Sequence, residues 1–183
     1  MDAIRTISTS LRGVVILEPR VFGDERGFFL ESYNRRVFAE LGIEEQFVQD
    51  NHSRSRRNVL RGLHYQIKHP QGKLVRVVEG EILDVAVDVR RSSPTFGVCE
   101  AVRLSGENKR MLWIPPGCAH GFRVCSEQAH VLYKATDYYA PEHERTLMWN
   151  DPDLKINWEL EGEPIVSAKD QSGLALRDAE TFT

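Results

Sequence analysis

The chain has 183 residues, of which 41% are hydrophobic and 28% are charged, and its formal net charge is −3. This length predicts a single domain over residues 1–183, with the N-terminal segment and the C-terminal tail packed on it. A mildly acidic chain without a basic block disfavours nucleic acid as a partner, and the absence of an apolar run near the roughly 20 residues of a bilayer span disfavours a membrane protein.

Apolar and polar residues alternate in short stretches along most of the chain, which predicts strands. The candidates are Val14–Leu17, Phe28–Tyr33, Phe47–Asp50, Asn58–Gln66, Lys73–Val78, Glu81–Val89, Val98–Leu104 and His130–Thr136. A helix is expected at Arg35–Leu41, closed by Gly42, and a second short one near Pro141–His143. Many short strands with a few short helices predict a mainly β fold, a jelly-roll β-sandwich.

Two local patterns predict how the strands pair. The dipeptide Glu79-Gly80 separates two strand candidates and predicts a hairpin between them. Val14–Leu17 has no hairpin partner close in the sequence, and an unpaired strand invites pairing across a two-fold axis. The sequence therefore predicts a homodimer.

Arg61 and His64 lie close together in the strand candidate Asn58–Gln66. Histidine is suited to moving a proton near neutral pH, and the arginine fork is suited to binding phosphate. Strict alternation places Arg61 on the face opposite His64. A histidine in a strand is more often packed or hydrogen-bonded than catalytic, so this pair needs partners elsewhere in the chain.

The segment from Trp113 to Phe122 contains the pattern Pro-x-Gly-x-x-His, ending at His120. This pattern resembles the second half of the cupin signature, in which the histidine is a metal ligand. The first half needs two histidines one residue apart, and no His-x-His occurs in the chain. A cupin-like fold without a bound metal is therefore expected.

Other polar residues have no distinguishing signal when each is considered alone. Lys73 opens a strand candidate, and Lys169 and Asp170 form a pair that is typical of a solvated surface. Tyr133 points inward on its strand, where a tyrosine is either a core residue or a proton donor. No Gly-x-Gly-x-x-Gly motif is present, so no dinucleotide cofactor is expected.

The cysteines and the first ten residues bear on the compartment. Cys99, Cys118 and Cys125 are odd in number and irregularly spaced, which favours reduced thiols in a reducing compartment over disulfides or a zinc site. Residues 1–10 lack the apolar segment of a secretory signal.

Several longer blocks resemble the dTDP-4-dehydrorhamnose 3,5-epimerase family. They are Phe47–His52, Asn58–His64, Gln71–Arg76, Asp84–Asp88, Ser93–Gly97, Trp113–Phe122, Tyr133–Tyr139 and Trp149–Pro152. The resemblance runs in order from about Gly13 to Asp170, and Cys118 stands where the family usually has a bulkier apolar residue. It implies a metal-free, cofactor-free cupin-type homodimer that acts in the cytoplasm on dTDP-4-dehydro-6-deoxy-D-glucose.

The resemblance also implies a role for each site residue. His64 would be the general base, Tyr133 the general acid, Lys73 the group that stabilises the enolate, and Asp170 the partner that orients His64. Tyr139 would stack on the thymine. The remaining residues expected to bind the nucleotide sugar are Arg26, Glu31, Gln49, Asn51, Arg61, His120, Glu144 and Lys169.

The chemistry explains why such residues would be needed. Carbons 3 and 5 of the substrate flank the ketone at carbon 4, so removal of either proton gives an enolate, and one base with one acid on opposite faces can invert each centre. Three alternatives remain open at this point. They are a single epimerase at carbon 3 or carbon 5, a metal-dependent cupin enzyme, and a sugar-binding module without catalytic activity.

Overall fold

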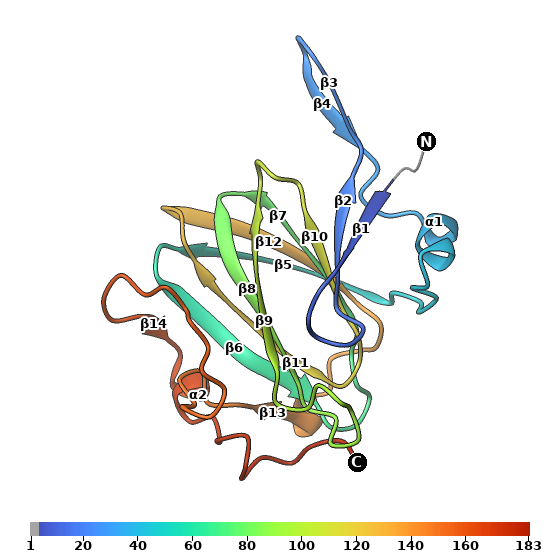
Figure 1. Cartoon of the computed structure of the whole chain (residues 1–183). Coiled ribbons are helices and arrows are strands. Elements are labelled where there is room, and N and C mark those ends of the chain that lie inside the picture. The colour runs from blue at the N-terminus through green and yellow to red at the C-terminus, as the bar shows by residue number, and fades with distance from the viewer. Residues whose placement is uncertain (1–3) are drawn as a thin grey trace.

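The computed structural model describes residues 4–183 and has two large sheets that face each other (Figure 1). In spatial order, the first sheet comprises β1 (Ile4–Ser8), β2 (Val15–Pro19), β10 (Met111–Ile114), β7 (Lys73–Glu79), β12 (Gln128–Ala135) and β5 (Gln49–Arg56). The second comprises β13 (Glu144–Thr146), β6 (Val59–Gln66), β11 (Cys118–Val124), β8 (Glu81–Asp88) and β9 (Cys99–Ser105), with β14 (Ile165–Val166) paired to β6. This mainly β sandwich confirms the predicted fold class.

Helices are few and short. They are α1 (Arg35–Glu40), the 3-10 turn η1 (Pro141–His143) and α2 (Ala168–Gln171). The side chain of Asn34 caps α1, and Gly42 follows the helix with a positive φ of 84°, which a glycine adopts without strain. Both predicted helices are confirmed. No helix within residues 4–183 is long and apolar enough to cross a membrane.

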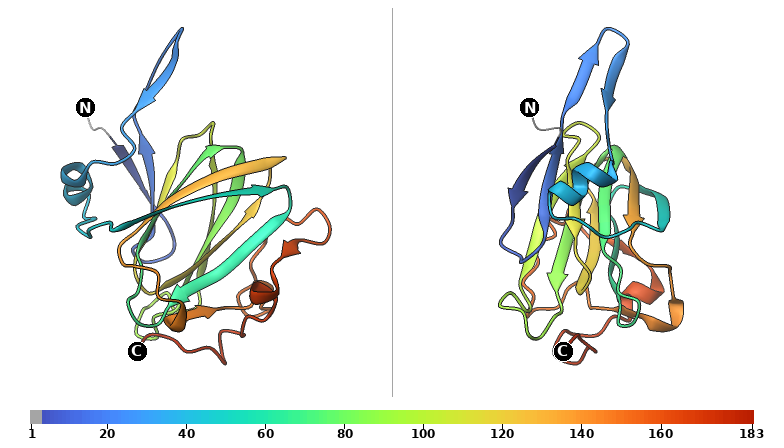
Figure 2. Two further views of the ribbon diagram at one scale, coloured as in Figure 1. Left: turned by 180° about the vertical axis from the view of Figure 1, so that it is seen from behind. Right: turned by 90° about the vertical axis from the view of Figure 1, so that its right-hand side faces the viewer.

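Strand β8 separates two hydrophobic clusters because both of its faces are buried. Ile82 and Ala86 face the cluster between the two sheets. Leu83 and Val85 face a second cluster, on the outside of the second sheet, which the C-terminal segment completes with Leu154, Trp158 and Leu176. Figure 2 shows this segment running along the second sheet. Its packing fixes the position of the residues near 170 relative to β6.

The turn at Glu79-Gly80 corrects one prediction. Strand β7 pairs with β10 and β12, whereas β8 pairs with β9 and β11, so the two strands do not form a hairpin. The turn carries the chain from one sheet to the other. A Cβ at Gly80 would lie 2.0 Å from the carbonyl oxygen of Gln128, so glycine is required by a close approach rather than by a hairpin.

The pairing of β2 corrects the prediction that Val14–Leu17 is an unpaired strand. Strand β2 is hydrogen-bonded to β1 on one side and to β10 on the other, so it is not an unpaired edge. The argument for a homodimer from this strand is therefore wrong, because Ile4–Ser8 forms a strand that pairs with β2 and that the alternation did not reveal.

A bulge in β6 corrects the predicted faces of Arg61 and His64. His120 of β11 lies opposite His64, whereas Phe122 lies opposite Arg61, so β6 carries one extra residue between the two pairs. One extra residue reverses the alternation of faces along a strand. Arg61 and His64 consequently line the same cavity.

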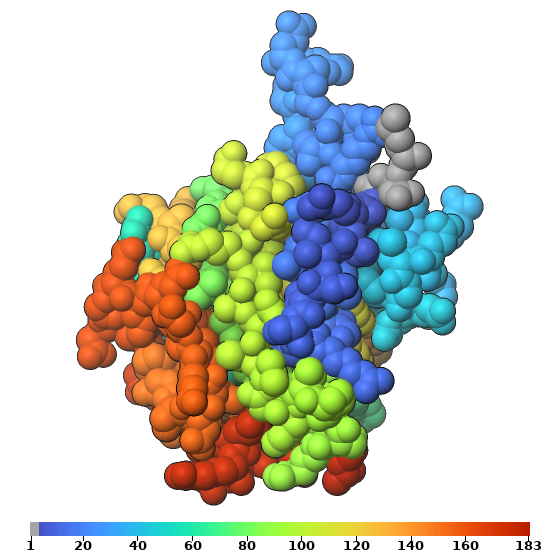
Figure 3. Space-filling view, in the orientation of Figure 1, coloured from blue at the N-terminus to red at the C-terminus, as the bar shows by residue number. Residues whose placement is uncertain are grey.

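A hairpin of β3 (Val21–Asp24) and β4 (Gly27–Leu30) projects from the body of the molecule (Figure 3). Its apolar side chains are largely exposed: Phe22 is 51%, Phe28 60% and Phe29 69% accessible. Exposed aromatic side chains gathered on one projecting element are typical of a surface that another chain covers.

Asp88 ends β8 as a fully buried carboxylate. It accepts hydrogen bonds from Arg90, Ser93 and Thr95. Burial alone would raise the pKa of Asp88, but these hydrogen bonds lower it to about 2. We expect Asp88→Asn to destabilise the fold by about 3 kcal/mol, because it leaves the Arg90 guanidinium without its counter-charge.

Urea unfolding at neutral pH measures this loss. A folded-state pKa below the unfolded value means that the stabilisation is present above about pH 4 and disappears as the pH falls through 2. The difference in unfolding free energy between the wild type and Asp88→Asn should therefore shrink in acid. A difference that is independent of pH would contradict the ionic origin of the effect.

Candidate active site

A cavity of about 580 Å³ opens between β6 and β11 of the second sheet, β12 of the first sheet, and the C-terminal segment. Several residues that the sequence predicted for the site line it together, although they are spread over more than a hundred positions. They are Arg61, His64, His120, Tyr133, Lys169 and Asp170. The fold thus brings a candidate base, a candidate acid and several cations to one cavity.

His64 and Asp170 form a hydrogen-bonded pair at the cavity wall. The Asp170 carboxylate is buried on α2, and its Oδ1 lies 2.5 Å from Nε2 of His64. Burial raises the pKa of Asp170, but the hydrogen bonds from His64 and from the Gly62 N–H outweigh it, and the net shift is downward. An ionised Asp170 accepts the proton of Nε2, which assigns the free lone pair to Nδ1. His64 can therefore accept a proton from a molecule in the cavity.

Asp170 is held in place from two sides. Its carboxylate accepts a hydrogen bond from the backbone N–H of Gly62, at 3.3 Å. Its own backbone N–H donates to the side chain of Ser167, which caps α2. These contacts orient the carboxylate toward His64 independently of the histidine.

Tyr133 reaches the cavity from the opposite sheet. It lies on β12, opposite Val75 of β7 and Asn51 of β5, and it packs against the cluster between the sheets. Burial raises the pKa of Tyr133, and the negative charge of Glu144 raises it further. The phenol therefore keeps its proton at neutral pH and can donate it.

Lys73 is buried at the start of β7, and its Nζ makes no hydrogen bond to any residue between 4 and 183. Burial lowers the pKa of Lys73 to about 8, while the charges of Glu144 and Asp84 oppose this lowering. The lysine is therefore cationic at neutral pH but loses its charge in mild alkali. It is not among the residues that line the cavity, although its electrostatic partners belong to the site.

A second group of predicted residues is connected to the cavity through Lys169, which lines it. Glu144 on β13 accepts hydrogen bonds from the hydroxyl of Tyr139, at 2.8 Å, and from Nζ of Lys169. Gln49 accepts the backbone N–H of Tyr139 and donates to Asn51. Tyr139 is 52% exposed, so its aromatic side chain is accessible to a planar ligand.

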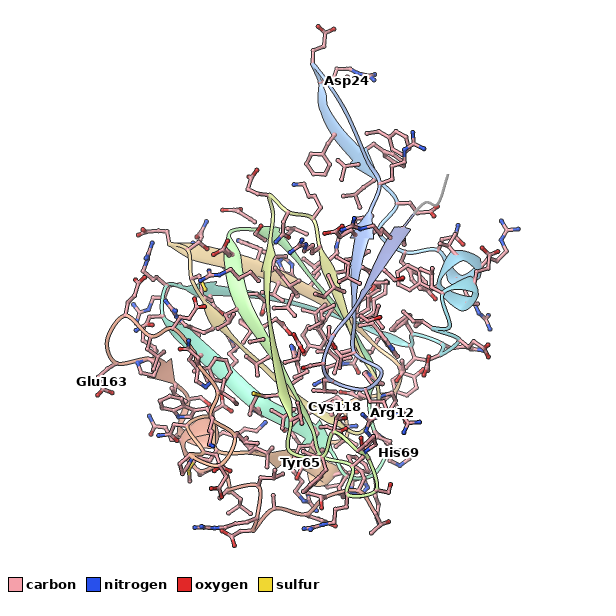
Figure 4. All side chains as sticks on the ribbon, in the orientation of Figure 1. Arg12, Asp24, Tyr65, His69, Cys118 and Glu163 are labelled. Carbon is pink, nitrogen blue, oxygen red and sulfur yellow. The ribbon has the colours of Figure 1, made fainter. Side chains whose placement is uncertain are left out.

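Arg26 and Glu31 are not brought to this cavity within one chain. Arg26 lies in the turn of the β3–β4 hairpin and is hydrogen-bonded to Asp24, which Figure 4 labels at the end of the hairpin, far from the sheets. Glu31 accepts a hydrogen bond from Asn34, at 3.2 Å. Their predicted place in the site requires a partner that the single chain does not supply.

The cavity region contains polar residues that the sequence did not single out. Ser53 lines the cavity, and its Oγ is buried without a hydrogen-bond partner in the described chain. Asp84 is fully buried and faces His120. Ser53 lies in a polar run and has no sequence signal of a binding residue. Asp84 does have one, because a carboxylate inside the apolar strand Glu81–Asp88 indicates a buried charge that needs a partner.

Cys118 lies apart from the cavity lining. Burial raises the pKa of Cys118 to about 12, so the thiol stays protonated at neutral pH and is not a nucleophile. Within residues 4–183, no group of three or more His, Cys, Asp or Glu side chains is arranged to hold a metal ion.

The chain is similar in sequence and in structure to known enzymes. The family model described as dTDP-4-dehydrorhamnose 3,5-epimerase matches residues 8–178. The epimerase of that name from Pseudomonas aeruginosa is 63% identical over 92% of this chain and 94% of its own length, and the one from Salmonella typhimurium is 57% identical over 94% and 96%. A crystal structure of dTDP-6-deoxy-D-glucose-3,5-epimerase from Legionella pneumophila, in complex with dTDP-4-keto-L-rhamnose, is 51% identical and superimposes with a TM-score of 0.95 over 97% of this chain and 95% of that one.

Proposed function

The chain belongs to the dTDP-4-dehydrorhamnose 3,5-epimerase family, and we propose that the cavity between its two sheets carries out the double epimerisation for which that family is named. The protein is an isomerase that acts on a dTDP-linked 4-keto sugar. Its substrate is dTDP-4-dehydro-6-deoxy-D-glucose, and its product is dTDP-4-dehydro-6-deoxy-L-mannose, the precursor of dTDP-L-rhamnose. We assign this activity to one domain spanning residues 1–183.

The observation that carries the proposal is the origin of the base and the acid in different sheets. His64 enters the cavity from β6 of the second sheet, and Tyr133 enters it from β12 of the first. A sugar ring between them presents one face to each. Removal of a proton by His64 and return of a proton by Tyr133 then inverts the carbon.

Each carbon is inverted by the same sequence of events. His64 Nδ1 takes the proton from carbon 3 or carbon 5, and the electron pair of the broken C–H bond moves to the ketone oxygen as an enolate. The cationic Lys73 stabilises this charge, which exists only after the proton has left. The enolate carbon then takes the phenolic proton of Tyr133 on the other face. The resulting tyrosinate regains a proton from solvent, and His64 releases its proton to solvent before the second carbon reacts.

The remaining site residues bind the nucleotide in this proposal. Arg61 would bond two diphosphate oxygens with its planar fork. Tyr139 would stack on the thymine, with Gln49, Asn51, Glu144 and Lys169 contacting the polar groups around it. The buried amide nitrogen of Asn51 has no hydrogen-bond partner within residues 4–183, which supports such a contact, because a buried donor without a partner is costly unless a ligand satisfies it.

Proton NMR of the product formed from dTDP-4-dehydro-6-deoxy-D-glucose tests this function. Inversion at both carbons by protein dialysed against a chelator is the expected result. Inversion at only one carbon would identify a single epimerase. Activity that requires a divalent ion would identify a metal-dependent enzyme, and absence of turnover would identify a binding module.

We further propose a cytoplasmic homodimer in which the β3–β4 hairpin of each subunit completes the site of the other. The free thiols Cys99, Cys118 and Cys125 support a reducing compartment. The exposed aromatic residues of the hairpin support the dimer, because a second chain would bury them. The proposal also gives Arg26 and Glu31 a route to a cavity that they do not reach in their own chain.

Mixed dimers of two defective subunits test this exchange. If Arg26 serves the partner's site, a dimer of one Arg26→Ala and one His64→Asn subunit contains one site with both residues intact. Mixing and refolding the two variants should then restore activity well above that of either variant alone. No gain on mixing, or sedimentation at only the 21.0 kDa of the single chain, would contradict the exchange.

The pH dependence of kcat/KM tests the role of Lys73. The free enzyme should lose activity above about pH 8, because the buried Lys73 is deprotonated there and no longer stabilises the enolate. Lys73→Arg keeps its charge throughout this range, so its activity, although lower, should not decline between pH 8 and pH 10. An unchanged alkaline decline in this variant would assign the decline to another group.

A further inference from the structure

A second histidine–carboxylate pair lies beside the first. His120 on β11 is directly opposite His64 on β6, and both line the cavity. Nε2 of His120 lies 3.0 Å from Oδ1 and 2.9 Å from Oδ2 of Asp84, on the adjacent strand β8. The cavity is therefore bordered by two imidazoles, each held through Nε2 by its own carboxylate.

The second pair is more deeply buried than the first. Asp84 is fully buried and His120 is 6% exposed, whereas the His64 side chain is 26% exposed. Asp84 occupies the face of β8 that also carries Ile82 and Ala86, which pack in the cluster between the sheets. A carboxylate in such a place is unfavourable unless a hydrogen-bonding cation accompanies it.

His120 is the only hydrogen-bond partner of the Asp84 carboxylate within residues 4–183. One N–H is shared between two carboxylate oxygens, so the ring is clamped and its Nε2 is a donor. Nδ1 has no hydrogen-bond partner in the same range of residues, and His120 lines the cavity. The clamp leaves Nδ1 available to a ligand.

The charge of Asp84 acts on Lys73 as well. It opposes the effect of burial on that lysine, as does the charge of Glu144. Asp84 is thus a fully buried carboxylate that acts on both His120 and Lys73. These are the two groups that could donate hydrogen bonds to an enolate oxygen.

We propose that Asp84 is a positioning residue that orients His120 and holds it as an imidazolium, so that its Nδ1–H donates to the ketone oxygen and shares the enolate charge with Lys73. The inference rests on the proposed epimerisation. The proton of Nδ1 stays on the ring throughout, because it only hydrogen-bonds to the oxygen while His64 and Tyr133 exchange protons with carbon. The two histidine–aspartate pairs then have different tasks. His64 must be neutral to accept a proton, and His120 must be charged to stabilise the negative charge of the enolate.

The protonation of His120 can be measured without turnover. In protein labelled with 15N-histidine, the ring signals of His120 are assigned by their loss in His120→Gln. Wild-type protein with bound dTDP at pH 7.5 should show both His120 nitrogens protonated, whereas His64 should show one. A neutral His120 ring in the wild type would overturn the inference, whatever the activity of any variant.

Asp84→Asn supplies the kinetic test, because it keeps the shape and an acceptor for Nε2–H but removes the charge. The variant should show a neutral His120 ring and a kcat lower by about 10²-fold, with little change in KM. Proton exchange from substrate into solvent should fall in parallel with inversion, because formation of the enolate itself is impaired.

Asp88→Asn is the matched control, since it removes another fully buried carboxylate from the same strand, outside the cavity. It should lower stability while leaving the kcat of the folded fraction and the His120 signals unchanged. An Asp84→Asn variant with unchanged kcat, alongside a wild type that inverts the substrate, would reject the inference while the proposed function stands.

Discussion

Replacing His64 by asparagine is expected to abolish inversion at both carbons and to stop the exchange of substrate protons with deuterated water. Asparagine has a similar shape and can still hydrogen-bond to Asp170, but it has no basic nitrogen. The loss of a general base corresponds to about 10²–10⁴-fold in rate. Because the same base would serve carbon 3 and carbon 5, both exchange rates should fall together.

Mass spectrometry of deuterium uptake, with proton NMR of the two carbons, measures this result. Binding of dTDP to the variant, determined by calorimetry, is the control, since the nucleotide does not contact the reacting carbons. Continued exchange at one carbon in His64→Asn would show that a second base serves that centre.

Replacing Tyr133 by phenylalanine is expected to separate exchange from inversion. The variant keeps His64 and Lys73, so the enolate still forms, and His64 returns a solvent-derived deuteron to the original face. Inversion should fall by about 10²-fold or more, because the proton donor on the other face is gone. Deuterium uptake without a change of stereochemistry is the diagnostic outcome.

Two other outcomes would contradict this division of roles. Near-normal epimerisation by Tyr133→Phe would mean that the tyrosine is a core residue whose hydroxyl is dispensable. Equal loss of exchange and inversion would mean that Tyr133 assists the first proton abstraction. Since Tyr133 packs against the cluster between the sheets, thermal unfolding of the variant controls for a structural effect.

The sequence predicted most of the elements because their signals are local. Alternation identified β8 and β12, and Gly42 identified the end of α1. Pairing was predicted less well, since it depends on which sheet each strand joins. Glu79-Gly80 has the composition of a hairpin turn, yet its glycine serves a close approach to Gln128, which is distant in the sequence.

The site shows the same division between local and distant information. His64 stood out in its own segment of the sequence, whereas the roles of Tyr133 and Lys73 and their assembly with His64 followed only from the family resemblance. Spacing alone could not reveal that a bulge turns Arg61 and His64 to one face, or that Asp170 reaches His64 across 106 positions. Arg26 shows a further limit, because the hairpin that carries it does not bring it to the cavity within one chain.

The order of the elements along the chain has a consequence for truncated chains. Every strand except β14 ends by Thr146, so both sheets precede Asp170. The partner of His64 arrives only afterwards, with the segment that covers the second sheet. A chain that stops between Thr146 and Asp170 therefore loses two features at once: the carboxylate beside His64 and part of the cluster that covers the second sheet.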